Sequence, residues 1–220
     1  MNRQEIIEMF RVENPEITSR VITDAYLQSQ CKEGNRRVCS LAKCITDEDG
    51  TVISTSENDE RFDLTDKIDK FYAIDSYPGS GVLYNNERLK STTMAELDND
   101  DENWRDRSSG TPEKFYRRGK WLCLDRPVGS EEDDLKVYCV LKPDDFDADT
   151  KTPYNELEYL EPFHYAIVLY LKWRAKEKVG KGTEAKGAET EFLSYIAYMK
   201  KELGGSKFKP IRFLPRAGTV

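Results

Sequence analysis

The order in which hydrophobic patterns follow one another is what most constrains the fold of this 220-residue chain. Apolar residues recur at a helical period in the first part, up to the turn signal Asp47-Glu48-Asp49-Gly50. β-forming residues then alternate as far as Pro143, and the helical period returns after Pro153. Helices from the two ends bury their apolar faces by packing together. We therefore predict an α+β fold, in which N- and C-terminal helices form a helical bundle, with a β-rich insertion between them and an extended C-terminal tail.

The predicted boundaries follow these changes of pattern. The chain is 38% apolar and 34% charged, which allows a buried core under a strongly polar surface. The N-terminal helices of the bundle are expected at residues 1–46 and the β-rich insertion at 47–143. The C-terminal helices of the bundle are expected at 144–204 and the tail at 205–220.

Two helices are expected before the insertion. The first spans residues 2–12 and stops before Pro15, because the residue that precedes a proline is pushed out of the α region. Its apolar side consists of Ile6, Ile7, Met9 and Phe10. The second begins after Thr18 and continues through Gly34, where glycine costs about 1 kcal/mol relative to alanine.

Two helices are also expected after the insertion. One has a wide apolar face from Leu157 to the region of Lys176, and the other begins near Ala185 and ends at Gly204-Gly205. The sequence Val179-Gly180-Lys181-Gly182 indicates either a turn between them or a loosened stretch of helix.

The insertion carries signals for short strands and one helix. Residues 71–75 and 82–84 flank a Pro-Gly-Ser-Gly turn and predict a hairpin, and a second hairpin is expected where 114–118 and 121–125 flank Gly119-Lys120. A Ser or Thr cap followed by Glu96 predicts a helix start, since this pairing satisfies free backbone amides reciprocally. Residues 135–141 are expected to form the last strand.

The charge of the chain argues against a protein that grips DNA by its phosphates. The net charge is −7 and the isoelectric point is near 5.1, whereas such a protein is normally basic. Cationic bias is confined to residues 172–186 and 200–216. An acidic protein can still surround DNA, because like charge lets the polymer slide freely.

No stretch of 18 or more uncharged apolar residues predicts a membrane span. The opening residues Met1-Asn2-Arg3-Gln4-Glu5 lack the apolar core of a secretory signal. We therefore expect a protein that is made in the cytoplasm and has no membrane partner.

Five cysteines do not predict a disulfide framework, because their number is odd and an export signal is not apparent. Cys39 and Cys44 do not form a Cys-x-x-Cys pair, and a single histidine disfavours a zinc site. The simplest interpretation is that most of the cysteines are small buried apolar residues.

Two acidic segments are candidate cation sites. Residues 145–156 place acidic residues at positions 1, 3, 5 and 12 of a calcium loop, but Thr150 stands where the sharp turn requires glycine. The alternative is a solvated loop with Glu156 near a helix N-terminus. The cluster at residues 98–103 has no glycine and no distal ligand, so we expect a solvated loop beside Trp104 and no metal or cofactor.

His164 is the single histidine, and no nucleophile pattern accompanies it. We expect it to pack in the interior with one ring nitrogen hydrogen-bonded. No phosphate-binding glycine loop is apparent either, so no catalytic residue is predicted.

The C-terminal tail is the best candidate for a partner-binding segment. It alternates cationic and apolar residues and is too short to form a core of its own, so it suits addition to a sheet edge or a groove of a partner. The alternative is a disordered terminus. The candidate binding residues are Phe208, Pro210, Ile211, Arg212, Phe213, Leu214 and Arg216.

The order of several motifs resembles the head-to-tail adaptor (connector) proteins of tailed bacteriophages. The segment 14–24 resembles the turn into the first helix of that family, Gly110-Thr111-Pro112 resembles its Gly-x-Pro turn, and residues 159–166 resemble the start of its long C-terminal helix. The resemblance covers residues 1–203. The more polar segment 26–44 and the last sixteen residues depart from it.

The resemblance implies a structural virion protein without enzymatic activity. It implies a homo-oligomeric ring of twelve copies in the neck of the virion, at the head-tail junction. The ring would bind the portal protein above and a tail or nozzle protein below, and genomic DNA would pass through its channel without sequence-specific binding. The tail of each copy would reach toward the portal.

Two other functions stay open at this point. The first is a binding module of a phage tail or baseplate that recognises its ligand through exposed Trp104, Tyr116 and Trp121, although aromatic residues in a β layer are more often core. The second is a hydrolase, which lacks a nucleophile and base pair in this sequence.

Overall fold

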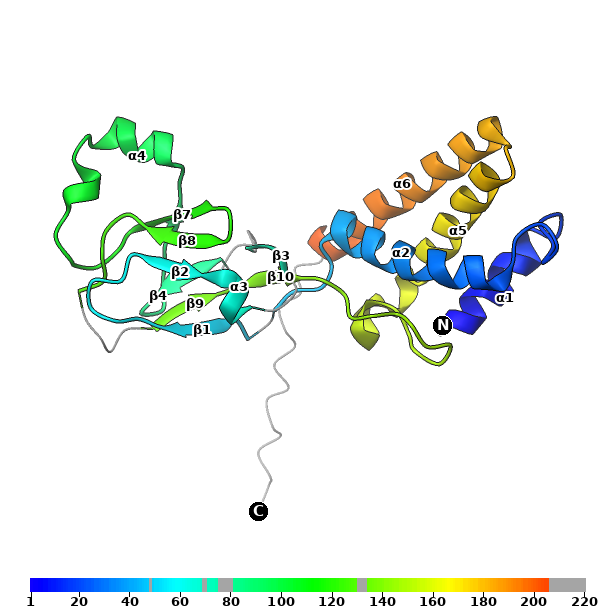
Figure 1. The fold of residues 1–220 in the computed structure, drawn as a ribbon, viewed down its shortest axis with the longest axis horizontal. Helices are drawn as coiled ribbons and strands as arrows, with labels where there is room; N and C mark the ends of the chain where they lie inside the picture. Colours follow the sequence, from blue (N-terminus) through cyan, green and yellow to red (C-terminus); the bar gives the residue numbers. More distant parts are fainter. Residues whose placement is uncertain (48, 69–70, 75–80, 130–133, 206–220) are drawn as a thin grey trace, which may run out of the picture. The chain divides into compact units, whose positions relative to one another are not determined.

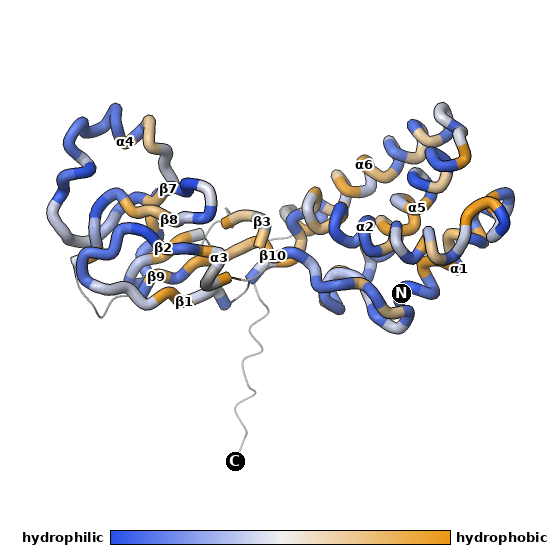
Figure 2. Tube along the Cα trace, in the orientation of Figure 1, coloured by the Kyte–Doolittle hydropathy of each residue, from blue (hydrophilic) through white to orange (hydrophobic). Residues whose placement is uncertain are grey.

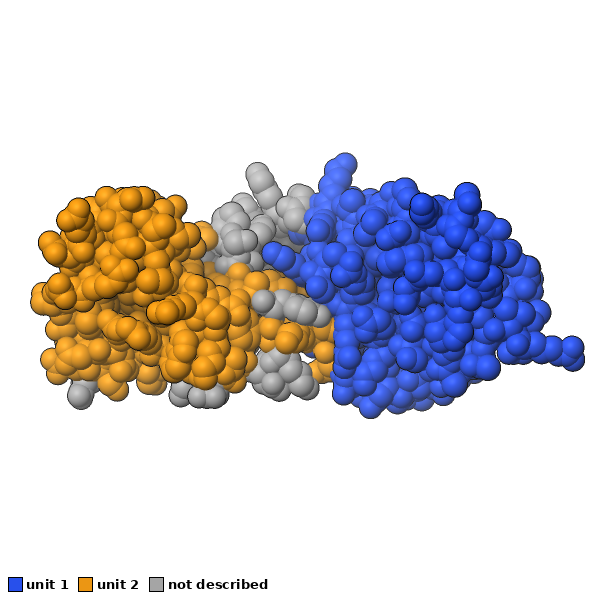
Figure 3. Space-filling model, turned by 45° about the horizontal axis from the view of Figure 1, so that its top comes forward, with its two compact units in different colours: residues 1–44, 145–220 blue, residues 45–144 orange. Residues whose placement is uncertain are grey.

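The computed structural model describes residues 1–47, 49–68, 71–74, 81–129 and 134–205. Helices lie at both ends of the chain and short strands fill the middle, so the predicted α+β class is confirmed (Figure 1). Two compact units divide the chain (Figure 3). Residues 1–44 with 145–220 form the helical unit, and residues 45–144 form the β unit. Within the described residues, no helix is both long enough and apolar enough to cross a membrane.

Helix α1 (Arg3–Glu13) confirms the first predicted helix. Asn2 and Glu5 form a capping box, in which each side chain accepts a hydrogen bond from the other residue's backbone amide. The helix ends at Asn14, directly before Pro15. The assignment of Met9 to the apolar side was wrong, because this side chain is 37% exposed.

Helix α2 (Asp24–Ala42) begins later than its sequence pattern predicts. Its N-cap is Thr23, whose hydroxyl accepts the amide of Tyr26. The Arg11 guanidinium donates to the carbonyl oxygens of Ile17 and Ile22 at 2.7 and 2.6 Å, and both isoleucines are buried. These contacts keep the segment before Thr23 in a loop, which a periodicity argument does not detect.

Gly34 lies in the middle of α2 without interrupting it, as expected. A Cβ atom at this position would lie 2.9 Å from Cδ1 of Tyr170 and 3.3 Å from Cγ2 of Ile167. Both of these residues belong to helix α5 (Tyr165–Lys178). Glycine therefore permits the close approach of α2 to α5.

The predicted helix from Leu157 begins later, at α5, because the preceding segment forms the 3-10 turns η2 (Tyr154–Glu156) and η3 (Glu158–Phe163). Pro162 lies inside η3, and a proline lacks the amide that a longer α-helix would need there. Residues 166–171 are buried all round, because α5 packs against α1, α2 and α6 (Gly182–Gly205). The predicted turn between α5 and α6 includes Gly180 with φ of +76°.

The described strands of the β unit form three small sheets. All pairings are antiparallel except the parallel pair of β6 with β7. The first sheet has the order β1 (Thr51–Ser54), β9 (Asp134–Val137), β4 (Val82–Tyr84) and β5 (Glu87–Arg88). The second pairs β10 (Cys139–Leu141) with β3 (Phe71–Ile74). The third has the order β2 (Arg61–Asp63), β8 (Trp121–Leu124), β7 (Lys114–Arg118) and β6 (Lys90–Ser91).

Local turn chemistry predicted one hairpin correctly and one wrongly. β7 and β8 pair across Gly119, whose φ of +61° favours glycine. In contrast, β3 and β4 belong to different sheets and do not pair. β4 instead pairs with β9, which places Val82 opposite Val137 and so brings two buried apolar residues together.

The predicted last strand is also divided in two. β9 and β10 belong to different sheets, and Tyr138 separates them. The Tyr138 amide donates to the carbonyl oxygen of Gly81 at 2.8 Å, at the point where the chain passes from one sheet to the other. Val137 and Cys139 on either side are both fully buried.

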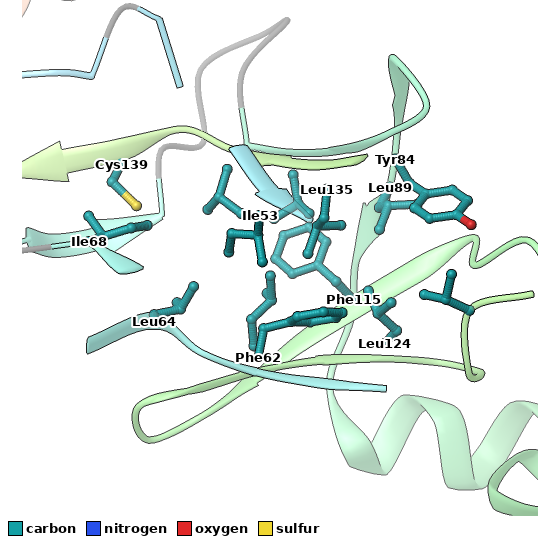
Figure 4. Packing of buried hydrophobic residues seen from close by; sticks show 14 of the residues in the cluster. Ile53, Phe62, Leu64, Ile68, Tyr84, Leu89, Phe115, Leu124, Leu135 and Cys139 are labelled. Atoms are coloured by element: carbon teal, nitrogen blue, oxygen red, sulfur yellow. The ribbon is translucent and has the colours of Figure 1, made fainter. Parts of the chain in front are cut away.

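One apolar cluster joins the sheets of the β unit. Ile53 of β1, Leu135 of β9, Phe62 of β2 and Phe115 of β7 turn toward one another in it (Figure 4). The remaining helical pieces are α3 (Leu64–Lys67), α4 (Met94–Asp100) and the turn η1 (Trp104–Asp106). The α4 capping box of Thr93 and Glu96 confirms the predicted helix start, and α4 itself is mostly hydrophilic (Figure 2).

Candidate functional site

The loop of residues 145–156 binds the two N-terminal helices. The Arg3 guanidinium donates from Nε and Nη2 to Asp149 Oδ1 at 2.9 and 2.8 Å. The Arg3 amide donates to the carbonyl oxygen of Lys151, which satisfies one of the free amides at the start of α1. On α2, the Asn35 side chain accepts the amide of buried Tyr154 at 3.1 Å. The loop is therefore part of the helical unit's packing.

The three aspartates of this loop are paired with cations, and this does not support the calcium hypothesis. Lys32 and Arg36 pair with Asp145, and Lys151 pairs with Asp147. Hydrogen bonds from Lys32 and Lys151 lower the pKa values of the carboxyl groups that they contact. Among the residues that the structure describes, no group of three or more His, Cys, Asp or Glu side chains is arranged for a metal ion.

The alternative prediction of a solvated loop is correct only in part. Phe146 and Tyr154 are buried, and the Tyr154 hydroxyl donates to the carbonyl oxygen of Phe163. Tyr154, Asn155 and Glu156 have φ values of +58°, +58° and +60°, which is strained for side chains other than glycine. Glu156 thus lies in a left-handed turn, just before the N-terminus of η3 and well before that of α5, so the helix end that it lies near belongs to a short 3-10 turn.

The acidic cluster at residues 98–103 is built around Trp104 and two arginines. Asp98 accepts from Trp104 Nε1 at 2.8 Å and from Arg105 Nη1 at 2.6 Å. Asp101 accepts from Arg107 at 2.9 Å. The hydrogen bond from Arg105 is the main cause of the lowered pKa of Asp98, and the Asn103 amide is the main cause for Asp101. These carboxylates hold the loop after α4 in place.

Asp125 is a buried charge that the sequence did not reveal. Its side chain is 1% exposed, and its Oδ1 accepts the amides of Glu113 and Lys114, each at 3.0 Å. Its Oδ2 accepts from Arg107 Nη1 at 3.0 Å. The carboxylate therefore links the Gly110-Thr111-Pro112 segment to β8, and no local pattern distinguishes it from a surface aspartate.

His164 is buried, and its Nδ1 accepts a hydrogen bond from the Met1 amine at 2.7 Å. Its ring lies 5.6 Å from that of Tyr154. Burial, and secondarily the positive charge of the amine, lower the pKa of His164 to about 4. The prediction of an interior histidine with one bonded ring nitrogen is confirmed.

All five cysteines are buried and none forms a disulfide. Burial raises the pKa of Cys31 to about 12, so its thiol is the stable form at neutral pH. The interpretation of the cysteines as buried apolar residues is confirmed.

The three aromatic residues of the binding-module hypothesis do not form a shared exposed surface. Trp104 and Tyr116 are 6% and 8% exposed and pack with Leu97 and Cys123, their rings meeting edge to face with centroids 5.8 Å apart. Trp121 is 39% exposed and lines an open hollow together with Arg61, Arg118, Cys123 and the edge of Tyr116. The hypothesis was wrong for two of the three residues, since they are core.

The basic tract at residues 172–186 is used largely within the helical unit. Lys172 pairs with Glu191 at 2.7 Å, and Lys176 pairs with Glu184 at 3.1 Å, so both join α5 to α6. Lys181 also reaches Glu184 at the turn between these helices. Part of the positive charge of this tract is therefore neutralised within the helical unit.

Charge is divided unequally between the two units. Residues 45–144 include 24 acidic and 14 basic residues, a net charge of −10, and the remainder of the chain includes 17 acidic and 20 basic residues, a net charge of +3. The acidity of the protein therefore belongs to the β unit.

The tail residues named as candidate binding residues, 208–216, lie outside the described residues. Their role stays a prediction. Within the described residues, exposed large apolar side chains gather instead on the helical unit, including Val12 on α1 and Leu193 on α6, and the sequence patterns did not single these out.

Comparison with known proteins identifies the family of this chain. The family model described as SU10 adaptor protein matches residues 1–209, which includes both compact units. No curated protein matches the chain. The chain therefore belongs to the SU10 adaptor protein family, a phage head-tail adaptor family, and is a structural component of a bacteriophage virion.

Proposed function

We propose that this protein forms the adaptor ring at the head-tail junction of a tailed phage. Twelve copies dock under the portal, extend its DNA channel and present a surface to a downstream tail or nozzle protein. The ring lies in the neck of the virion and joins the capsid to the tail. It is assembled from chains made in the host cytoplasm.

The observation that carries this proposal is the match of a phage adaptor family to both units together. Such a family is structural and not normally enzymatic, and its members associate with other virion components. The buried positions of His164 and the cysteines agree with a structural role, because they leave these groups without access to a substrate.

Genomic DNA passes through the ring without sequence-specific binding. A net charge of −7 supports this, since a dodecamer repels the DNA phosphates and does not hold them. A phosphate-gripping protein would instead release counterions on binding and depend steeply on salt.

The C-terminal tail binds the portal in this proposal. The support is in the sequence: Lys207, Lys209, Arg212 and Arg216 alternate with apolar residues in a segment too short to bury them. An extended segment of this composition suits addition to a sheet edge or insertion into a groove of the portal.

The test measures the mass of the purified protein with and without its cognate portal, by native mass spectrometry. We expect a closed ring in stoichiometric complex with the portal. A truncated chain ending at Gly205 should lose portal binding. A chain with Thr219 replaced by Ser is the matched control and should keep it.

Each outcome decides one part of the proposal. If the full chain never joins the portal, the adaptor function is refuted. If the truncated chain joins the portal as well as the full chain does, the ring stands and the tail is not its portal-binding segment.

A further inference from the structure

Helix α1 exposes an apolar stripe with negative charge beside it. Its buried side consists of Ile6, Ile7 and Phe10, together with Arg3. The opposite side, which we call the α1 stripe, consists of Glu5, Glu8, Met9 and Val12. Val12 is 80% exposed and Met9 is 37% exposed.

Charge at the α1 stripe is acidic. Arg11, the nearest cation on the helix, is occupied by Asp24 and two carbonyl oxygens of the following loop. Glu8 accepts only a neutral hydrogen bond, from Gln4 at 2.8 Å. Glu5 caps the helix and has the Met1 amine 4.0 Å away, so Glu8 is the main source of uncompensated charge.

Helix α6 exposes a second stripe, whose net charge is positive. Its buried side includes Ala188, Phe192, Ile196 and Met199. A flank next to this buried side, the α6 stripe, consists of exposed Lys186, Leu193, Ala197 and Lys200 and half-buried Glu189, at helical spacing. Leu193 is 45% exposed, and the small Ala197 next to it leaves room for another helix to approach.

The two stripes lie on different helices of the unit. α5 packs against both α1 and α6 and lies between them in Figure 1. Tyr165 of α5 shows this arrangement, because its hydroxyl contacts Glu13 of α1 and its ring lies 5.9 Å from Tyr195 of α6. Each copy therefore presents the α1 stripe and the α6 stripe as two separate surfaces.

We infer that the α1 stripe of one copy packs against the α6 stripe of the next copy. Val12 and Met9 then cover Leu193 and Ala197, and Glu8 lies near a lysine. This inference rests on the ring of the proposed function and names the surfaces that build it.

Charge selects this arrangement over a symmetric dimer. Contact between two α1 stripes brings carboxylates together, and contact between two α6 stripes brings together two surfaces of net positive charge, so both are disfavoured. Pairing of two different surfaces is a heterologous contact, which closes into a ring when its rotation closes. Such a head-to-tail contact requires two separate surfaces on each copy, which the stripes on α1 and α6 provide.

Cross-linking of the full-length protein tests the inference. The double variant V12C/L193C, treated with a thiol cross-linker of about 10 Å, the distance between packed helices, should give a ladder of covalent oligomers up to the closed ring. The native cysteines are buried and should not react. V12C and L193C alone are the controls and should give no oligomers. Dimers from V12C alone would overturn the inference, because they require a symmetric contact.

Exchange of charge gives a second, independent test. Q4K/E8K places lysines at Glu8 and at Gln4 beside the α1 stripe, so that the charge there becomes positive, and K186E/K200E makes the α6 stripe acidic. Each variant alone should assemble at least tenfold more weakly than the unchanged protein. An equimolar mixture should regain assembly as an alternating ring, because each reversed stripe then meets a reversed partner. Failure of the mixture to regain assembly would overturn the inference.

The outcomes separate this inference from the proposed function. A ring that forms on the portal but gives no Val12–Leu193 cross-link overturns the inference and leaves the adaptor function standing. Cross-linked rings that form in solution but never join a portal support the inference and refute the adaptor function. A cross-link between V12C and the portal itself would also overturn the inference.

Discussion

The two units of this protein contain similar amounts of chain and are stabilised differently. In the helical unit, α5 is buried all round by three other helices, and ion pairs lie at the edges of the bundle. In the β unit, short strands in three sheets share one apolar cluster, and a buried carboxylate orders the chain beside it. The β unit has a net charge of −10, and the rest of the chain has a net charge of +3.

This difference indicates where association is to be expected. Of the exposed large apolar residues, most lie in the helical unit, and the β unit contributes Val52 and Trp121. A surface with apolar stripes gains free energy when it is covered, whereas a strongly acidic surface stays solvated and repels its copies. Negative charge is therefore concentrated in the β unit, whereas most of the exposed large apolar side chains belong to the helical unit.

The largest effect is expected in the β unit, where Asp125→Ala removes a buried charge. The amides of Glu113 and Lys114 and the Arg107 guanidinium would lose their acceptor, which should lower the free energy of unfolding by about 3–5 kcal/mol. Urea unfolding, together with hydrogen exchange of the β7 and β8 amides, measures the loss. Asp106→Ala, at an exposed position, is the control and should change stability by less than about 0.5 kcal/mol. A small effect of Asp125→Ala would show that the apolar cluster is sufficient to stabilise the β unit without this carboxylate.

The helical unit should respond most to crowding of its helices. Gly34→Leu places a side chain against Tyr170, where a Cβ atom alone already lies 2.9 Å from the ring, and should cost about 3 kcal/mol. Ser29→Leu, at an exposed position of the same helix, should be nearly neutral. Urea unfolding compares the two variants. Equal stability of both would mean that α2 and α5 pack less closely than the structure indicates.

Acid should weaken the helical unit through His164. Its pKa is lowered from 6.5 to about 4, so the folded state binds fewer protons than the unfolded state between these values. The stability is therefore fully present above pH 6.5 and is lost as the pH falls toward 4, by about 2 kcal/mol between pH 8 and pH 5. Carboxyl groups with lowered pKa values contribute their own loss only below this window.

The measurement is urea unfolding at pH 8 and pH 5. His164→Gln should flatten the difference between the two, because an amide does not titrate. An unchanged pH dependence in the variant would show that groups other than His164 cause the acid sensitivity.

The smallest expected effect is a gain in stability on α6. Gly187 has nothing within 4 Å of the position of a Cβ atom, so Gly187→Ala should raise the free energy of unfolding by about 0.5–1 kcal/mol through helix propensity alone. The midpoint of urea unfolding measures the gain. Loss of stability or of assembly would indicate that another copy covers this side of the helix.

The sequence predicted the features that depend on neighbouring residues. The α1 capping box, the α4 start at Thr93 and the β7–β8 hairpin at Gly119 are each determined within a few residues, and all three are confirmed. The interior position of His164 also followed from the sequence, since no nucleophile pattern accompanied it. Burial of most cysteines was predicted because their number and spacing indicate neither a disulfide framework nor a zinc site.

Contacts between distant residues account for the remaining errors. In the sequence, Trp104 and Tyr116 resemble a binding surface. In the structure they are buried, because Leu97 and Met94 of α4 pack against them. The acidic loop of residues 145–156 looks like a calcium site until Arg3, Lys32 and Arg36 reach it from the other end of the chain. The exposed stripes of α1 and α6 appear only once the buried sides of both helices are known.

By itself, the sequence therefore determined the α+β class, the order of helices and strands and the local starts and turns, because periodicity and capping act over a few residues. Only the tertiary structure decided which strands pair, where α2 and α5 begin, and which charges are neutralised. β4 pairs with β9 and not with β3, and β9 and β10 separate at Tyr138. The physical reason is that the free energy of these choices comes from burial and ion pairing between segments far apart in the chain, which no local pattern records.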